Sequence, residues 1–549
     1  MSDLLNGAVE AAAGLSVHGA DTVDGSAPAS TREALVSAGV PAKLAAKDPT
    51  LWGPDAEAEA KVRLGWLDVH LRSRDLLPQL AELKAELADL DHVVLAGMGG
   101  SSLAPEVIAR TLGKQLTVLD TTDPGQVRAA LADRLERTVV VVASKSGSTV
   151  ETDSHRRAYW QAFLDAGLSE AEAGRHFVIV TDPGSPLEAT AAEMGAFTVL
   201  ADPNVGGRYS ALTAFGLVPS ALAGVEVAEL LDEAEALARS LGGDRDNPGL
   251  ALGAALGAAA TMGRDKIALV SDGTGIEGLG DWAEQLIAES TGKAGVGILP
   301  VVVESPQSPG ATGDDVLTVT YGGALAAGAV PGGGADADVA VNGPLGAHFL
   351  AWEYATAIAG VVLGIDPFNQ PNVTESKENT NRILASGAPA ETPSFTEGAI
   401  EVYAPQGAPG DLAGVLRQLV DGVGDGGYLA VLAYLDRFAD ADAAGLRPLL
   451  ASAGGRPVTF GWGPRFLHST GQYHKGGPQV GSYLQLTGAV ADDLPVPGRP
   501  YTFGQLQAAQ AAGDRQALAE RKRPVVRLHL TDRSAGVAQL LDAVGALRT

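Results

Sequence analysis

The sequence predicts an α/β protein with two doubly wound parallel-sheet, Rossmann-like domains, an N-terminal arm and an additional C-terminal α/β segment. Short β-branched runs alternate with helical stretches along most of the chain. This is the pattern of parallel sheets that are covered by helices on both faces. The chain has 549 residues, 46% of them apolar, so it is long enough to form two or three domains with their own cores.

The N-terminal 240 residues divide into an arm and a first domain. Residues 1–60 are rich in Ala, Ser and Gly and weakly patterned, which predicts an arm with short helices. Residues 61–241 form the first domain, which begins with Leu and Val at helical spacing and ends before the Gly242–Pro248 linker. Its expected strands are Val93–Ala96, Leu116–Leu119, Val139–Val142, Phe177–Val180 and Phe197–Leu200.

A second α/β series follows, and we assign residues 242–400 to a second domain. Residues 401–549 are expected to be an α/β portion that completes this second half, with Glu391–Gly398 as a loop before it. The expected strands of both segments are Ile267–Ser271, Gly297–Val303, Leu317–Thr320, Asp338–Val341, Tyr428–Leu435, Pro457–Phe460 and Val525–Leu530.

Composition narrows the classes of function. The formal net charge is -27, so the average electrostatic potential of the protein repels anions. The sequence has no basic run interleaved with aromatic residues, so we do not expect nucleic-acid binding. The absence of Cys excludes disulfides and thiolate chemistry. No basic stretch precedes the first apolar residues and no 18-residue apolar run occurs, so we expect no signal peptide, no membrane span and a cytoplasmic protein.

The segment Thr138–Thr152, TVVVVASKSGSTVET, predicts a phosphate site. A buried strand runs into a turn rich in hydroxyls and then into a helix, so hydroxyls, one ammonium and free helix N–H groups converge where the strand ends. Ser148 and Glu151 have the spacing of a capping box at the start of that helix. The polar residues expected to hold a phosphate here are Ser144, Lys145, Ser146 and Thr149.

A second glycine-rich turn, Val93–Pro105, follows the first expected strand. Gly97 and Gly99 could begin a dinucleotide fingerprint, with Asp120 near the distance of a ribose-binding acid, but Ser102 replaces the third glycine. A single phosphate monoester or a plain tight turn also fits.

Two further motifs carry candidate catalytic side chains. In GGRYSALTAFG, paired glycines hold Arg208 where a guanidinium could stabilise a developing oxyanion. In DWAEQLIAESTGK, Glu289 lies in the last turn of an amphipathic helix, where the negative end of the helix dipole favours a base. The alternative to a catalytic role is that Arg208 forms an ion pair at the surface. For Glu289, the alternative is that it is a solvated residue at the end of a helix.

The C-terminal half has two more such motifs. Lys377 lies in the first turn of a helix, an unfavourable place for a cation unless the lysine serves another purpose. His468 and His474 lie in a glycine-rich loop after an expected strand. Metal binding by these histidines is the lesser alternative, because no metal-ligand spacing accompanies them.

Together these motifs resemble the glucose-6-phosphate isomerase family, which has paired sugar-isomerase (SIS) domains, over roughly Leu64–Leu530. GGRYSALTAFG is close to one family signature. GVVLGIDPFNQPNVTESK is close to the other, with Asn372 where glycine is usual and Thr374 where glutamate is usual. The nearest variant is the isomerase half of transaldolase–isomerase fusions, here in a freestanding form.

The resemblance implies roles for particular residues. It assigns the proton transfer between C1 and C2 to Glu289, stabilisation of the cis-enediolate to Arg208 and ring opening to His468, assisted by Lys377. HSTGQ, the motif with His468, follows the lysine motif by 91 residues here, whereas it precedes it in related bacterial enzymes. His348 is therefore the alternative for ring opening. The substrate phosphate is assigned to Gly100, Ser101, Ser144, Lys145, Ser146 and Thr149.

The expected function is the interconversion of glucose 6-phosphate and fructose 6-phosphate by acid–base chemistry, with no cofactor and no metal. The expected partner is a hexose phosphate, with no nucleic acid, no membrane and a possible homodimer. Additional phosphomannose isomerase activity, a non-catalytic phosphosugar sensor and a dinucleotide-dependent oxidoreductase are the alternatives.

Overall fold

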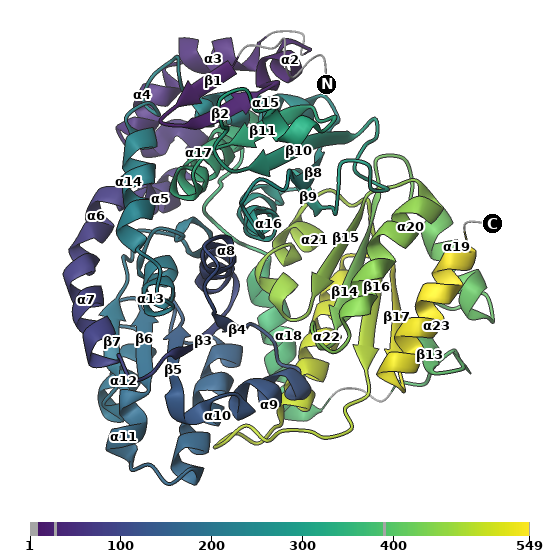
Figure 1. The fold of residues 1–549 in the computed structure, drawn as a ribbon. Helices are drawn as coiled ribbons and strands as arrows, with labels where there is room; N and C mark the ends of the chain where they lie inside the picture. Colours follow the sequence, from purple (N-terminus) through teal and green to yellow (C-terminus); the bar gives the residue numbers. More distant parts are fainter. Residues whose placement is uncertain (1–8, 27–29, 388–390, 548–549) are drawn as a thin grey trace.

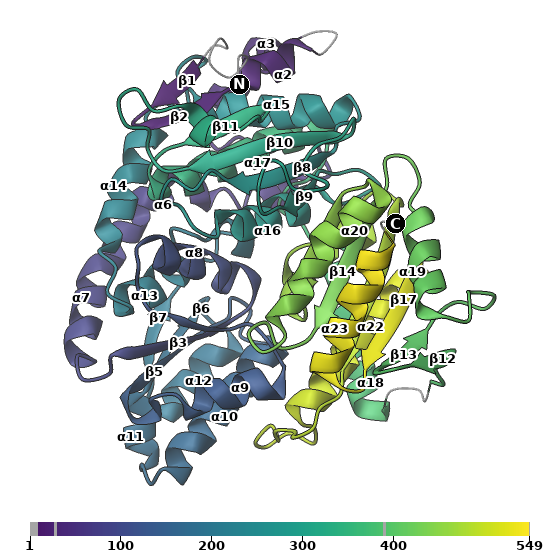
Figure 2. The same cartoon turned by 45° about the vertical axis from the view of Figure 1, so that its right-hand side comes forward.

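The chain forms three sheets of mostly parallel strands separated by helices, as the computed structural model shows for residues 9–26, 30–387 and 391–547 (Figure 1). The α/β class predicted from the sequence is therefore confirmed. Turning the molecule shows the third sheet as a separate layer beside the other two (Figure 2).

The first sheet is entirely parallel, in the order β4-β3-β5-β6-β7. Alternate residues of its central strand enter two different cores: Val139 and Val141 pack on one face, Val140 and Val142 on the other. This two-sided burial explains the uninterrupted β-branched run in the sequence. The strands are β3 His92–Gly97, β4 Thr117–Leu119, β5 Thr138–Ala143, β6 Phe177–Thr181 and β7 Phe197–Leu200.

Helices cover both faces of this sheet, and its carboxyl edge leads to the candidate site. The helices around it are α7 Leu76–Glu86, α8 Leu103–Thr111, α9 Pro124–Ala132, α10 Val150–Asp165, α11 Glu170–Arg175, α12 Pro186–Met194 and α13 Ala214–Leu222. The continuous helix expected from residue 61 is instead a series of short turns before α7, among them α6 (Val69–Arg72).

The second sheet has the order β1-β2-β11-β10-β8-β9. Its first two strands come from the segment expected to be an arm of short helices, because β2 pairs antiparallel with β11. The N-terminal residues thus complete this sheet. The strands are β1 Val9–Ala12, β2 Leu15–His18, β8 Lys266–Ser271, β9 Leu299–Val302, β10 Val316–Gly322 and β11 Val339–Asn342.

The helices that pack with the second sheet include the longest of the described residues, α17 (Leu345–Leu363). By length and composition α17 could cross a membrane, although no apolar run of this length was expected from the sequence. In the structure, 89% of its apolar window is buried inside the protein, as in a core helix. The other helices of this region are α2 Ala20–Gly25, α3 Thr31–Ser37, α4 Val40–Ala45, α5 Glu57–Ala60, α14 Val227–Ala238, α15 Pro248–Thr261 and α16 Leu279–Thr291.

Residues from 395 onward form a third sheet of their own, in the order β12-β13-β17-β16-β14-β15. Its strand β14 faces a core of its own on one side and, on the other, a core shared with β8 and β9. Strand β12 lies in the segment expected to be a loop, and neither β13 nor β16 was expected. The strands are β12 Phe395–Glu397, β13 Ile400–Tyr403, β14 Tyr428–Tyr434, β15 Val458–Trp462, β16 Gly481–Gly488 and β17 Val525–Leu530.

Six helices accompany the third sheet: α18 Val373–Ser386, α19 Leu412–Asp421, α20 Leu446–Gly454, α21 Gly471–Gly476, α22 Phe503–Glu520 and α23 Arg533–Ala546. One hydrophobic core extends from Leu15 to Phe368, across both of the first two predicted domains. The boundaries at 61, 242 and 401 remain predictions.

Candidate functional site

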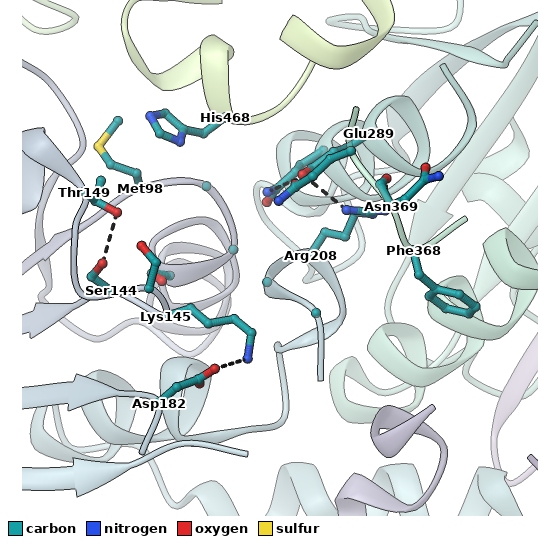
Figure 3. Close-up of a pocket in the computed structure, with 18 of the residues that line it drawn as sticks. Met98, Ser144, Lys145, Thr149, Asp182, Arg208, Glu289, Phe368, Asn369 and His468 are labelled. Atoms are coloured by element: carbon teal, nitrogen blue, oxygen red, sulfur yellow. Dashed lines mark hydrogen bonds and ion pairs between the residues drawn. The ribbon is translucent and has the colours of Figure 1, made fainter. Parts of the chain in front are cut away.

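All ten site residues predicted from the sequence line one cavity of about 620 Å³ (Figure 3). The cavity lies between the carboxyl edge of the first sheet, helix α16 and the loop that precedes α21. The ten residues are Gly100, Ser101, Ser144, Lys145, Ser146, Thr149, Arg208, Glu289, Lys377 and His468. Their roles remain predictions, but the folded chain brings them together.

The turn after β3 approaches the Arg208 loop through a glycine contact. A Cβ on Gly100 would lie 1.9 Å from the carbonyl oxygen of Gly207, so only glycine lets the two backbones come this close. Gly99 has φ +53°, a left-handed conformation that also favours glycine. The turn that carries Ser101 is therefore held directly against the backbone of the loop that carries Arg208.

The turn after β5 presents its hydroxyls to the cavity. Ser144 Oγ and Thr149 Oγ1 lie 3.0 Å apart and hydrogen bond to each other. The expected capping box is wrong: Thr149 is the N-cap of α10, and the Ser148 hydroxyl lies 3.0 Å from that of Ser146. The physical reason is that the Glu151 carboxylate is engaged elsewhere, by groups of the C-terminal region.

The lysine of this turn already has a charged partner. Lys145 Nζ donates to Asp182 and also lies 3.4 Å from the carbonyl oxygen of Pro203. Burial raises the pKa of the Asp182 carboxyl, although the ammonium of Lys145 opposes this rise. The Lys145 side chain is 23% exposed, so it can reach an anion in the cavity.

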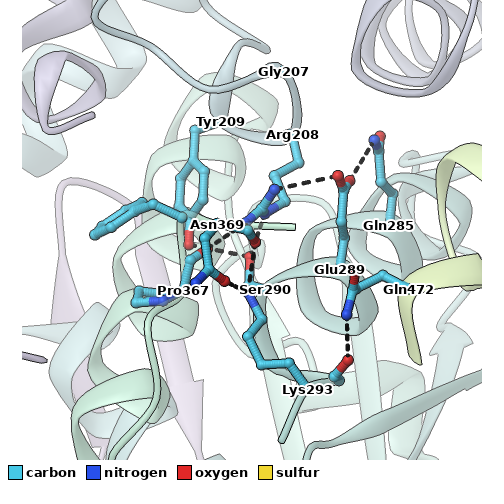
Figure 4. Close-up of polar contacts among 12 residues, drawn as sticks. Gly207, Arg208, Tyr209, Gln285, Glu289, Ser290, Lys293, Pro367, Asn369 and Gln472 are labelled. Carbon is cyan, nitrogen blue, oxygen red and sulfur yellow. Dashed lines mark hydrogen bonds and ion pairs between the residues drawn. The ribbon is translucent and has the colours of Figure 1, made fainter. Parts of the chain in front are cut away.

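Arg208 is fixed by neighbours on two segments, helix α16 and the loop that contains Pro367 and Asn369 (Figure 4). Its Nε donates to Ser290 Oγ at 2.8 Å, and its Nη2 donates to the carbonyl oxygens of Pro367 at 2.6 Å and Asn369 at 3.0 Å. Its Nη1 lies 3.2 Å from Glu289 Oε1. A buried guanidinium with this many partners has one orientation, which is the requirement for electrostatic preorganisation.

Glu289 is held from both sides at the edge of the cavity. Gln285, one turn earlier on α16, donates its Nε2 to Glu289 Oε2 at 3.0 Å, while Arg208 contacts Oε1. The glutamate is 7% exposed and lines the cavity. Gln285 also lines it, and the spacing of four residues from Glu289 was the signal that could have identified it.

Lys293 is a supporting residue that the sequence reading missed. Its Nζ contacts the carbonyl oxygens of Asp366 at 2.8 Å and Asn369 at 2.6 Å, as well as Asn369 Oδ1 at 2.9 Å. Burial and the nearby Arg208 lower its pKa to about 6, although three acceptors favour the ammonium form. Lys293 thereby ties α16 to the loop whose carbonyls hold Arg208.

His468 enters the cavity from the C-terminal region and is oriented by a buried carboxylate. Its Nε2 lies 2.9 Å from Glu151 Oε1, and Gln510 donates to the same oxygen at 2.7 Å. Burial opposes ionisation of Glu151, but His468 outweighs it and holds the pKa of Glu151 below its usual value. This glutamate was misread as a helix cap, and no sequence signal linked it to a histidine 317 residues away.

Of the remaining candidate residues, Lys377 lines the cavity, whereas His348 and His474 do not. Lys377 is exposed and lines the cavity. His348 is wrong as the alternative for ring opening: it is fully buried, its Nε2 lies 2.9 Å from the carbonyl oxygen of Gly322, and burial lowers its pKa to about 4. His474 is also buried, with Nδ1 2.9 Å from the Tyr428 hydroxyl, and is not part of the cavity lining. In the described part of the chain no cluster of His, Asp and Glu is arranged to hold a metal.

A turn-rich carboxyl edge of a parallel sheet, with hydroxyls on one side and an Arg–Glu pair on the other, defines a class of small-molecule site suited to phosphorylated substrates. Residues 83–295 match the family model described as phosphoglucose isomerase. This matched region holds eight of the ten cavity residues.

Individual proteins are similar to part of this chain. The chain is 34% identical over 248 residues to a probable glucose-6-phosphate isomerase of Haloarcula marismortui, covering 44% of this chain and 56% of that protein. It is 29% identical over 261 residues to a glucose-6-phosphate isomerase of Carboxydothermus hydrogenoformans, covering 43% of this chain and 55% of that protein. The matches thus span little more than half the length of these relatives.

The fold also resembles a solved structure. A hypothetical protein of Thermus thermophilus superposes with a TM-score of 0.55 at 24% identity, over 64% of this chain and 95% of that one. This similarity concerns the fold alone.

Proposed function

We propose that the protein interconverts glucose 6-phosphate and fructose 6-phosphate at this cavity. The observation that carries the proposal is the convergence of hydroxyl-rich turns, the Arg208–Glu289 pair and the Glu151–His468 pair around one cavity of about 620 Å³. A phosphate and a reactive carbon chain could be held at opposite ends of such a cavity. The match of residues 83–295 to the phosphoglucose isomerase family model supports the same reaction.

The phosphate would bind at the two strand-to-helix turns. The Ser144 and Thr149 hydroxyls now bond to each other, and each can rotate to donate to a phosphate oxygen instead. The N-terminus of α10 and the ammonium of Lys145 add positive potential at the same place. Binding at this end would fix the distance of C1 and C2 from the base.

Glu289 would act as the base that moves the proton. It takes the proton from C2, an enediolate forms across C1 and C2, and the same carboxyl returns the proton to C1 as the hydroxyl proton passes between O1 and O2. The Arg208 guanidinium, 3.2 Å from the carboxylate, lies where it can stabilise the developing oxyanion. Gln285 keeps the carboxylate in place through both transfers.

His468 would open the sugar ring before this proton transfer. Its imidazole exchanges a proton with the ring oxygen, and Glu151 fixes the orientation of the imidazole through the 2.9 Å contact. Lys377 lines the same cavity and supplies a second cation beside the ring. The enzyme would be a dual isomerase if it also accepted mannose 6-phosphate. Glucose 6-phosphate and mannose 6-phosphate differ only at C2, so the face of C2 that receives the proton decides which of them forms.

The experiment is turnover of glucose 6-phosphate by the purified full chain after treatment with EDTA, with fructose 6-phosphate as the measured product. We expect full activity without added metal. Strict dependence on a metal, or absorbance changes only with a nicotinamide cofactor, would contradict the proposal. Hexose phosphate binding without turnover would favour the phosphosugar sensor.

A further inference from the structure

A second cavity, of about 130 Å³, lies in the C-terminal sheet. It is lined by the carboxyl ends of β14, β16 and β17 and by helix α22, and shares no lining residue with the candidate site. In this sheet β14 pairs with β15 on one side and with β16 on the other, so the strand order reverses there. Ligands of parallel α/β sheets bind at such a reversal, beyond the carboxyl ends of the strands.

The cavity exists because the helix that covers it presents small side chains. Gly504, Ala508, Ala511 and Ala512 of α22 all line it. Its volume is several times the ~10–15 Å³ that one water requires. It therefore has room for a small organic molecule.

Five buried polar atoms of the cavity lining have no hydrogen-bond partner among the described residues, and two of them are the Nε atoms of Arg515 and Arg527. The other three are the hydroxyl of Tyr434, the Oε1 of Gln485 and the Nε2 of Gln507, whose residues are 1%, 0% and 4% exposed. Buried polar atoms of native proteins are nearly always paired with protein or with bound molecules. The acceptor of Gln485, the amide donor of Gln507 and the hydroxyl of Tyr434 are therefore available to hydrogen bond with a polar ligand.

One end of the cavity carries two guanidinium groups. Arg515 and Arg527 both line it and share a single carboxylate, Glu391, at 2.6 Å and 2.9 Å. Near them His529 Nδ1 lies 3.0 Å from Thr487 Oγ1. Glu401 also lies close enough to Arg527 to act on its charge, but the Nε atoms of both arginines are buried without a hydrogen-bond partner among the described residues. Both guanidinium groups therefore have an N–H donor left for an anionic ligand.

We propose that this cavity binds a small hydroxylated monocarboxylate. The unpaired guanidinium N–H groups of Arg515 and Arg527 match one carboxylate, and the unpaired amide and hydroxyl groups match the hydroxyls of the ligand. Helix α22 also carries Gln510, which holds the Glu151–His468 pair of the candidate site. A ligand under α22 therefore contacts the helix that supports that pair.

The test uses the full chain, isothermal titration calorimetry and glycerate as the probe. Glycerate should bind, and Gln507→Leu should weaken its affinity about tenfold, the value of one lost hydrogen bond. Because the Gln507 amide nitrogen has no protein partner among the described residues, the variant should unfold at no lower a temperature than the wild type. Gln516→Leu, on the same helix outside the cavity lining, is the control and should bind normally.

Thr487→Val provides a second variant in the cavity lining, for use if Gln507→Leu fails to fold, and should also weaken glycerate binding. A crystal structure with glycerate should show its carboxylate toward Arg515 and Arg527. Only ordered water in the cavity at saturating glycerate, binding of inorganic phosphate but not glycerate, or equal affinity in all three variants would overturn the proposal.

Discussion

The two sides of the candidate site differ in how firmly they are held. On the hydroxyl side, which we propose binds the phosphate, hydroxyls bond to one another and Lys145 is 23% exposed. On the opposite side, Arg208 and Glu289 are nearly fully buried and bonded to neighbours on several elements. The first side can exchange its internal bonds for bonds to a ligand, whereas the second is preorganised before any ligand arrives.

This comparison predicts that changes on the preorganised side mainly lower kcat, while changes on the hydroxyl side mainly raise KM. The strongest test is Glu289→Gln, which keeps the size of the side chain but removes the base. We expect kcat to fall by about 10²–10⁴-fold, with affinity for fructose 6-phosphate nearly unchanged.

Glu284→Gln is the matched control for that experiment. Glu284 lies on the same helix but does not line the cavity, and its Oε1 accepts from Ser469 at 3.3 Å. Its activity should stay close to that of the wild type. Equal losses in the two variants would mean that α16, rather than the base, had been damaged.

Arg208→Lys should produce the next largest effect. Lysine keeps the charge but cannot contact Ser290, Glu289 and the Pro367 carbonyl together, as the guanidinium does. We expect kcat to fall by about 10²–10³-fold, the usual effect of losing one oxyanion-stabilising donor. Steady-state kinetics and thermal unfolding of the variant would be measured together, and unchanged kcat would argue against this role.

Glu151→Gln tests the positioning of His468. The amide retains the shape but not the charge beside Nε2, so ring opening should slow and kcat on glucose 6-phosphate should fall by about 10²-fold. A tetrose 4-phosphate cannot close a ring, so solvent exchange of its C2 proton should be much less affected. Equal losses on both substrates would place Glu151 in the proton transfer or in folding instead.

Most of the site could be predicted because its residues lie in local motifs at the ends of apolar strands. Ser144, Arg208 and Glu289 each stand in a short segment whose turn or helix is set by neighbouring residues. Glu151 and Gln510 could not be found this way, because their partners are distant in sequence. Strands β1 and β2 were missed for the same reason: they form by pairing with β11, not by local preference.

On the hydroxyl side, Ser144→Ala should raise KM for glucose 6-phosphate by about tenfold to a hundredfold, the value of one hydrogen bond to a charged group, with little change in kcat. Ser148→Ala is the matched control, since Ser148 lies in the same turn but does not line the cavity. Initial-rate kinetics would check both. If Ser144→Ala lowered kcat and left KM unchanged, the expected difference between the two sides of the site would be contradicted.

The smallest expected effect is on stability and concerns Glu106 of α8, which pairs with Arg437 and Arg465 in loops of the third sheet. Burial opposes ionisation of Glu106, but Arg465 at 2.6 Å and Arg437 at 2.9 Å hold its pKa at about 2, below the ordinary 4.5. A depressed carboxyl pKa stabilises the fold above about pH 4.5, and this contribution is lost as the pH falls toward 2.

Glu106→Gln should therefore lower the free energy of unfolding near neutral pH and flatten its dependence on pH between about 4.5 and 2. Urea unfolding across this range would measure it, with Glu82→Gln at an exposed position as the control. A variant whose stability falls as steeply with acid as that of the wild type would show that Glu106 is not responsible.

The most direct measurement of the central claim is a crystal structure of the full chain with bound fructose 6-phosphate. The account predicts the phosphate within hydrogen-bond distance of Ser144 and Thr149, with C1 and C2 between the Glu289 carboxylate and the Arg208 guanidinium. A phosphate bound elsewhere, or a sugar whose C1 and C2 lie out of reach of Glu289, would contradict it.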